Sequence, residues 1–214
     1  PVQQSINFFL TFSGDFLLGI TILKLIPHVF EMATQPAIFI LLGFLIQMGL
    51  EGLSKGIEHG HLHLAERSPH FPWTITLGLA VHAFIEGLPL SHAFDMQSGV
   101  NNALFFGILI HKIPAAFVLL AVITSYGFSR LQGFSILAVF ALMTPLGTLV
   151  SRGLLSTPDM HETPYLQGIL GVVVGAFLHI STTILFEAQD KHQFTRSQVI
   201  AILTGLGVSA IALV

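Results

Sequence analysis

The chain of 214 residues contains no cysteine and very little charge. Without cysteine it has no disulfide and no thiolate ligand for a metal ion. Charged residues make up 9% of the chain and hydrophobic residues 53%, which lies far outside the range of ordinary soluble domains. The formal net charge is −3 and no basic tract is present, so nothing favours a nucleic-acid partner. The scarcity of charge indicates a membrane protein.

The hydrophobic residues occur in blocks of about 20, which is long enough to cross a hydrocarbon core of about 30 Å. The mean hydropathy of the chain is +0.82. We therefore expect an all-α polytopic protein in a lipid bilayer, with residues 1–214 forming a single transmembrane domain. The predicted spans are 5–30, 36–56, 73–94, 100–126, 132–154, 164–188 and 197–214.

The distribution of lysine and arginine predicts the orientation, because cytoplasmic loops carry an excess of both. If the longest loop, 55–71, is cytoplasmic, only Arg152 lies outside. The cations that then lie inside are Lys55, Arg67, Arg130, Lys191 and Arg196. The opposite orientation inverts this bias, so we expect the 55–71 loop to be cytoplasmic.

Two of the predicted spans carry ionisable residues near their midpoints: His82 and Glu86 in one, His111 and Lys112 in the other. Such residues at membrane depth mark ion pathways, proton relays or internal charge pairs. His82 and Glu86 are four residues apart and share one helical face. Imidazole and carboxylate groups are good ligands for a divalent transition metal. His82, Glu86 and His111 are therefore a candidate site for one metal ion, with open positions left for water.

Two other interpretations of these residues stay open. The first is a hydrogen-bonded cluster that only holds helices together, as polar side chains do in other membrane proteins. The second is an ion pair between Lys112 and Glu86, which would occupy the position of the metal. The partner of the Lys112 ammonium distinguishes these interpretations.

Further polar residues are secondary candidates. His59, His61 and His63 alternate in the 55–71 loop, which favours either loose metal capture at the cytoplasmic end of a pathway or an ordinary polar loop. His28 lies one turn after Lys24 near the outer end of the first span. His28 is either an entrance ligand or a surface residue, and we expect Lys24 to reach toward the lipid headgroups.

Three remaining ionisable residues fall within or close to the spans. Asp15 and Glu51 each either line a pathway or bind a partner helix. His179 lies near the middle of its span, where we expect an internal hydrogen-bonded histidine rather than a metal ligand.

The order and spacing of several motifs resemble those of ZIP (Zrt/Irt-like) divalent-metal transporters. The motifs are F-S-G-D-F-L-L-G-I-T-I-L-K-L-I-P, L-E-G-L-S-K-G-I-E-H-G-H, H-A-F-I-E-G, H-K-I-P-A, A-L-M-T-P-L-G and G-A-F-L-H-I-S-T-T-I-L-F-E. The resemblance implies a bundle of eight helices, of which seven are visible and the first lies upstream of Pro1. It also implies a cytoplasmic 55–71 loop, in agreement with the charge distribution.

The resemblance further implies transport of Zn²⁺ or another divalent metal toward the cytoplasm, with the metal as substrate, no prosthetic group and no enzymatic reaction. We expect a bacterial cytoplasmic membrane as the location, and a homodimer or a subunit of a membrane complex as the assembly. The alternative is a non-transporting membrane subunit or sensor, in which a pair between Lys112 and Glu86 replaces the metal.

The chain departs from the family pattern around the site. Ala83 stands where the family usually has Asn, and Ala115 stands where it has a second carboxylate. Lys112 occupies a position that often supplies a ligand, and Lys24 and His28 take the places of a His and a Glu. An ammonium beside a second dication would be strongly repulsive at low dielectric constant. We therefore expect at most one metal, bound by His82, Glu86 and His111.

Overall fold

The computed structural model describes residues 2–54, 71–91, 98–154, 164–187 and 195–211, and all of its regular elements are helical. The α-helices are α1 (Val2–Ile20), α2 (Ile26–Met32), α3 (Pro36–Ser54), α4 (Phe71–Gly87), α5 (Ser98–Ser125), α6 (Arg130–Leu154), α7 (Pro164–Glu187) and α8 (Arg196–Ile211). A π-helical segment, η1 (Thr21–Leu25), joins α1 to α2, and a 3₁₀ turn, η3 (Leu88–Leu90), follows α4.

The helices agree with the predicted spans. Six stretches are long and apolar enough to cross a membrane, and the first of them, Asn7–Met32, runs through α1, η1 and α2. The seventh, α8, covers 16 residues, so its described part is shorter than the roughly 20 residues that cross the hydrocarbon core. The chain is therefore a helical, multi-pass membrane protein, as its composition predicted.

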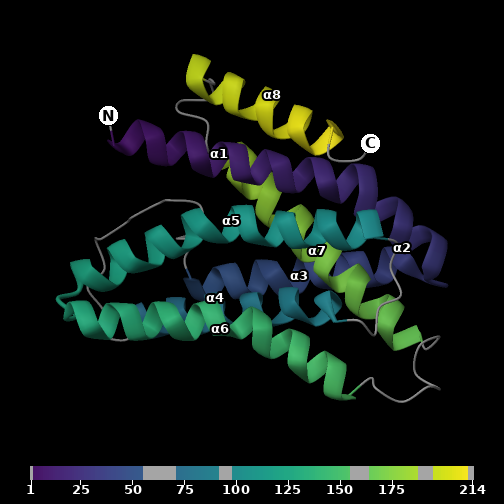
Figure 1. Ribbon diagram of the computed structural model, residues 1–214, viewed down its shortest axis with the longest axis horizontal. Helices are drawn as coiled ribbons and strands as arrows, with labels where there is room; N and C mark the ends of the chain where they lie inside the picture. The colour runs from purple at the N-terminus through teal and green to yellow at the C-terminus, as the bar shows by residue number, and fades with distance from the viewer. Residues whose placement is uncertain (1, 55–70, 92–97, 155–163, 188–194, 212–214) are drawn as a thin grey trace.

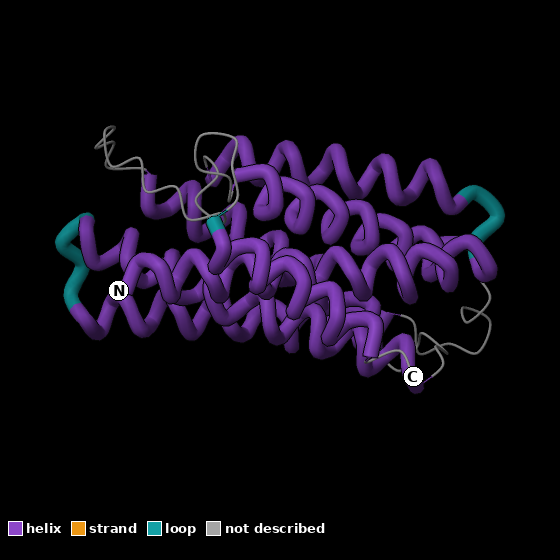
Figure 2. The backbone as a smooth tube through the Cα atoms, turned by 90° about the horizontal axis from the view of Figure 1, so that it is seen from above, coloured by secondary structure: helices purple, strands orange, loops and turns teal. Residues whose placement is uncertain are grey.

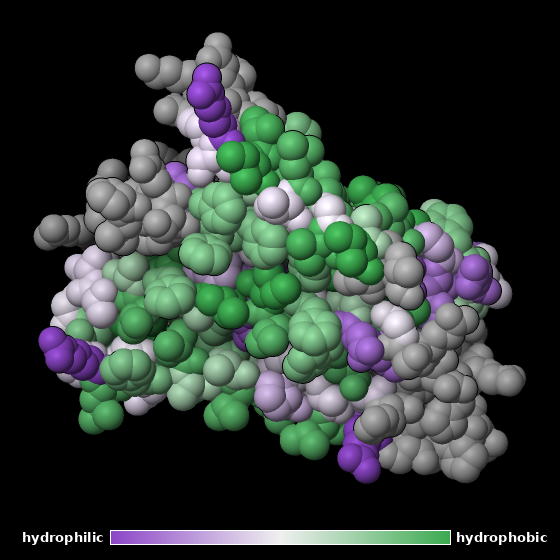
Figure 3. Space-filling model, turned by 45° about the horizontal axis from the view of Figure 1, so that its top comes forward, coloured by the Kyte–Doolittle hydropathy of each residue, from purple (hydrophilic) through white to green (hydrophobic). Residues whose placement is uncertain are grey.

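The helices form a bundle in which three pairs pack most extensively: α3 on α7, α1 on α8, and α4 on α6. Figure 1 shows α8 lying along α1 at one edge and α4 beside α6 at the opposite edge, with α5 between them. Viewed from above, the helices run along the bundle, and its two long described loops lie at opposite ends (Figure 2). The face seen in Figure 3 is largely apolar, and polar residues gather toward its ends, as expected for a protein surrounded by lipid.

Two hydrophobic clusters fill the interior, and α5 contributes to both. The first cluster joins α1, α2 and α7 to the first half of α5, including Leu104 and Ile108. The second joins α4 and α6 to the second half of α5, including Leu119 and Ile123. His111 and Lys112 lie between these two halves of α5. The two ionisable residues of α5 therefore sit at the boundary between the clusters.

Glycine residues allow α4 and α6 to touch through their backbones. A Cβ atom at Gly147 of α6 would lie 2.1 Å from the Phe84 carbonyl oxygen, and one at Gly87 of α4 would lie 2.1 Å from the Thr144 carbonyl oxygen. Small residues are the usual means of close helix approach in membranes. This contact fixes the part of α4 that carries Glu86.

We predict that Gly147→Ala destabilises the protein, because the added methyl group must push α4 and α6 apart. Overpacking of this kind costs about 1–3 kcal/mol. The matched control is Gly153→Ala in the same helix, where no atom lies within 4 Å of the added Cβ. Since alanine favours the helix over glycine, the control should be neutral or stabilising by up to about 1 kcal/mol. Thermal unfolding in detergent measures both, and equal shifts in the two variants would contradict the role of the contact.

Candidate metal centre

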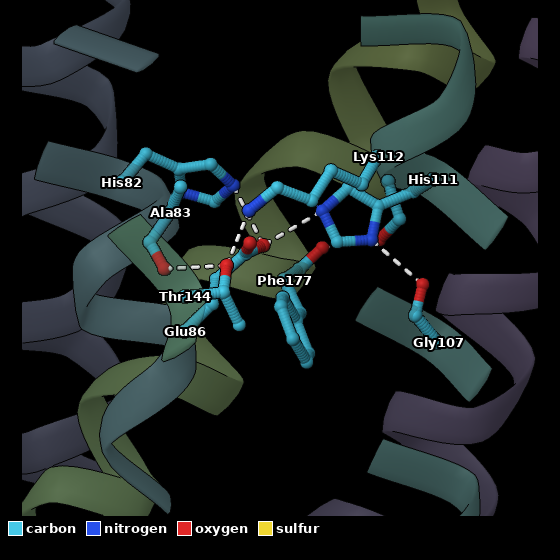
Figure 4. A network of polar contacts seen from close by, with 9 residues as sticks. His82, Ala83, Glu86, Gly107, His111, Lys112, Thr144 and Phe177 are labelled. Carbon is cyan, nitrogen blue, oxygen red and sulfur yellow. Dashed lines mark hydrogen bonds and ion pairs between the residues drawn. The ribbon is translucent and has the colours of Figure 1, made fainter. Parts of the chain in front are cut away.

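Three buried side chains from two helices converge in the middle of the bundle. His82 and Glu86 lie on one face of α4, and His111 comes from α5; all three are at most 6% exposed. The Nε2 atoms of both histidines lie 2.7 Å from Glu86 Oε1. One ligand atom from each residue lies within 4.8 Å of the other two (Figure 4). The structure thus brings together the three residues that the sequence singled out.

A backbone contact fixes the orientation of the His111 ring. His111 Nδ1 lies 2.7 Å from the carbonyl oxygen of Gly107, one turn earlier in α5. A carbonyl oxygen only accepts hydrogen bonds, so Nδ1 carries the proton and donates it. In the neutral ring, Nε2 then presents its lone pair toward Glu86. Metal-binding histidines are usually held by such a hydrogen bond from their second nitrogen.

Two electron-rich atoms therefore face each other across the site. The lone pair of neutral His111 Nε2 is directed at Glu86 Oε1, a carboxylate oxygen that also carries lone pairs and lies 2.7 Å away. Such an arrangement is favourable only with a cation between the two atoms, either a proton or a metal ion. Two ligands of a tetrahedral Zn²⁺ stand about 3.4 Å apart for bonds of about 2.0–2.1 Å. Accepting zinc would therefore require the distance from Glu86 Oε1 to each of the two Nε2 atoms to lengthen by about 0.7 Å.

The surroundings of the three candidate ligands are mostly apolar. A cavity of about 20 Å³ adjoins them, with walls from α1, α4, α5, α6 and α7, which is room for one water-sized body. Phe177 of α7 is fully buried and its ring meets the edge of the His111 ring at a centroid distance of 5.7 Å. A cation in this space would exchange its hydration for the protein ligands and for few other polar groups.

Lys112 does not form the ion pair with Glu86 that one of the two alternative interpretations required. Its ammonium donates a hydrogen bond to Thr144 Oγ1 on α6 and lies 4.6 Å from the centroid of the Phe140 ring (Figure 4). The recorded ion-pair contacts of Glu86 are those with the two histidines. The physical reason is that α6 offers both a hydroxyl acceptor and the negative face of an aromatic ring.

The sequence did not identify Thr144 and Phe140 as partners of Lys112. Thr144 also donates a hydrogen bond to the Ala83 carbonyl oxygen at 2.9 Å, so its hydroxyl connects α5, α6 and α4. The only sequence signal for Thr144 was its place beside a proline in A-L-M-T-P-L-G. That motif does not indicate which helix the threonine faces.

The two alanines that depart from the family pattern leave no further ligands. Ala83 is completely buried in the second hydrophobic cluster, and Ala115 lines the cavity with its methyl group. Among the described residues, His82, Glu86 and His111 form the one group of three or more potential metal ligands. The surroundings are consistent with a single ion.

The secondary candidates lie elsewhere. His28, on α2, is half-buried, and its Nε2 atom has no hydrogen-bond partner in the described part of the chain. Lys24, in η1, places its ammonium beside Gly99 at the start of α5. His59, His61 and His63 lie outside the described residues.

His179 is an internal hydrogen-bonded histidine, as expected. Its Nε2 atom contacts Glu51 Oε2, which links α7 to α3. The edge of its ring also packs on Phe44, with a centroid distance of 4.7 Å. Glu51 therefore binds a partner helix.

Comparison with known proteins identifies similar sequences. The model of the family described as ZIP Zinc transporter matches residues 51–212. Zinc transporter ZIP9-B of Xenopus laevis is 31% identical over 153 residues, which cover 67% of this chain and 49% of the relative. An uncharacterized protein of Methanocaldococcus jannaschii is 28% identical over 186 residues, which cover 84% of this chain and 75% of the relative.

A further relative is zinc transporter ZIP1 of Takifugu rubripes, 27% identical over 125 residues that cover 58% of this chain and 40% of the relative. The chain spans about half the length of the ZIP9 proteins that it matches. No solved structure matches. Because the family match extends over most of the sequence, from residue 51 to residue 212, the chain belongs to the ZIP zinc transporter family.

Proposed function

We propose that this chain carries Zn²⁺ or a chemically similar divalent ion across the membrane toward the cytoplasm. The observation that carries the proposal is the convergence of His82, Glu86 and His111 on one buried point. His82 is the twelfth residue of α4 and His111 the fourteenth of the 28 in α5, so both lie well inside their spans. The names of the curated relatives, as zinc transporters, support zinc as the substrate.

The ligand set suits transit through the membrane. Three protein ligands leave coordination positions for water, so an ion can enter and leave by stepwise ligand exchange. Metal binding requires the imidazole and carboxylate groups to be unprotonated, and their protonation weakens it. We propose that a proton occupies the site between His111 and Glu86 when the metal has left. The proposed activity makes and breaks no covalent bond, so it is not an enzymatic reaction.

The secondary histidines have proposed roles along the same route. We propose His28 as a ligand near the outer entrance, and His59, His61 and His63 as a capture site at the cytoplasmic end. For the location, the relatives named above come from animals and an archaeon, which gives no support to a bacterial cytoplasmic membrane.

One observation favours a second candidate function, a non-transporting membrane subunit or sensor. Lys112 brings a cation close to the ligands and is held there by Thr144 and Phe140. A positive charge near the site opposes a dication. The Lys112 experiment below separates this candidate from the transporter.

We predict that His82→Ala lowers the affinity for Zn²⁺ by a factor of about 100 or more, because a three-ligand site loses one of its protein ligands. The purified protein should bind one Zn²⁺ per chain by titration calorimetry, and the variant should also lose Zn²⁺ uptake in proteoliposomes.

The matched control is His179→Ala, which removes another buried histidine but leaves the three ligands in place. It should lower thermal stability without changing the binding stoichiometry. Unchanged zinc affinity in His82→Ala would rule out this site.

We predict that Lys112→Met raises the affinity for Zn²⁺ by at least about tenfold, since it removes a nearby positive charge and keeps the apolar part of the side chain. Lys112→Arg retains the charge and should leave the affinity within a few-fold of the original. A loss of thermal stability in Lys112→Met without a gain in affinity or uptake would favour the non-transporting function.

We predict that Zn²⁺ binding weakens as the pH falls from about 7.5 to 5.5, the range in which histidines ordinarily gain protons. The apparent affinity should fall by about tenfold per pH unit for each proton that the metal displaces. Calorimetry in buffers of different ionisation enthalpy counts these protons. The His179→Ala variant should show the same slope, and a pH-independent affinity would contradict ligation by histidine.

A further inference from the structure

The interface between α1 and α8 is built from small residues and lies apart from the metal centre. On α8, Ala201, Gly205 and Ser209 are buried and recur every fourth residue, which places them on one face. A Cβ atom at Gly205 would lie 2.8 Å from the carbonyl oxygen of Phe12 and 3.0 Å from the backbone nitrogen of Phe16. The two backbones therefore touch, and Figure 1 shows the helices side by side.

A carboxyl group lies at this contact. The Cβ atom of Asp15 lies 3.1 Å from the position of a Cβ at Gly205, and the residue is 1% exposed. Both oxygens of Asp15 are buried and have no hydrogen-bond partner within the described ranges. One turn earlier, Thr11 is also 1% exposed, and its hydroxyl oxygen likewise has no partner there. Two orphaned polar groups thus share one face of α1.

The charged groups on the neighbouring helices either lie several residues along the chain from the contact at Asp15 and Gly205 or already contact other side chains. On α8, Arg196 is the first residue, nine positions before Gly205. On α5, His111 contacts Glu86, and Lys112 donates a hydrogen bond to Thr144. Lys24, in η1, lies nine positions after Asp15, beside Gly99.

On α7, His179 contacts Glu51 of α3. Tyr165 and Glu187 are the second and last residues of α7; Glu187 follows one turn after Ile184, which packs on Gly14 of α1. No ion pair of Asp15 is recorded among the described residues, so no basic side chain there compensates a negative charge on it.

We propose that Asp15 is a proton-binding site separate from the metal centre and is held as the neutral carboxylic acid between α1 and α8. An isolated carboxylate buried in an apolar environment is far more costly than the neutral acid. A bound metal ion would need several further oxygen ligands, and α8 offers a glycine at the point of contact. The ligand of this site is therefore a proton.

Proton binding at Asp15 controls the contact between α1 and α8. Loss of the proton leaves a negative charge where the backbones are too close to admit water. The charge is then relieved only by separation of the helices. This inference does not depend on metal transport, because none of the three metal ligands takes part.

A direct test is chemical labelling with dicyclohexylcarbodiimide, an apolar reagent that adds to protonated carboxyl groups in membranes. Mass spectrometry of the full chain in detergent should locate an adduct on Asp15. Above the titration midpoint, the labelling should fall about tenfold per pH unit, because only the protonated fraction reacts. Zn²⁺ should protect Glu86 and leave the labelling of Asp15 unchanged. Protection of Asp15 by Zn²⁺ would overturn its independence from the metal centre.

A second measurement does not depend on access of the reagent. If the folded protein retains a proton that an unfolded aspartate has released, thermal stability must fall as the pH rises. Asparagine has nearly the same shape as aspartate and cannot ionise. The melting temperature of Asp15→Asn should therefore not show the fall with rising pH that the Asp15 proton causes in the original protein. Glu31→Gln, at an exposed position of α2, removes a carboxylate elsewhere and should follow the original protein.

Parallel pH profiles for the original protein and Asp15→Asn would overturn the proposal. Stabilisation of the original protein by Na⁺ or K⁺, absent in Asp15→Asn, would also overturn it, since the carboxyl would then be ionised and hold a cation. A decline with pH that disappears in Asp15→Asn supports it, whether or not Zn²⁺ is transported.

Discussion

The burial of one carboxylate, that of Glu86, is the constraint around which the middle of the bundle is organised. A charge at this depth must be matched, and two imidazoles from two helices approach the same oxygen at 2.7 Å. Holding them there requires α4 and α5 to keep a fixed relation. The backbone contact at Gly87 and Gly147 fixes α4 against α6, and the two hydrophobic clusters anchor α5 on either side of His111.

Lys112 shows how a membrane interior accommodates a cation beside a candidate metal site. Its ammonium is satisfied by a hydroxyl and an aromatic face on α6, while the carboxylate stays with the histidines. The positive and negative groups are thus neighbours with separate partners. This separation leaves Glu86 Oε1 in contact with the two histidines alone, which a direct ion pair with Lys112 would not.

The sequence predicted the helices and the cluster of His82, Glu86 and His111 because both depend on local signals. Apolar blocks define the spans, and the spacing of His82 and Glu86 defines a face. The partner of Lys112 could not be predicted, since the direction of a long side chain depends on α6, which is distant in sequence. Asp15 was also undecided, because its environment is created by Gly205 of α8, about 190 residues later in the chain. Local patterns in the sequence do not indicate which helices become neighbours in the fold.

The π-helical segment Thr21–Leu25 changes the geometry of everything that follows it in the first span. The backbone nitrogen of Ile26 donates to the Thr21 carbonyl oxygen five residues earlier, so this turn holds one residue more than an α-helical turn. One extra residue rotates the subsequent helix by about 100° relative to uninterrupted α-helix. A helical wheel that continues α1 through residues 21–25 as a regular α-helix therefore places His28 on the wrong face. Which way this histidine faces is set by the hydrogen-bond register at residues 21–25 rather than by its own neighbours.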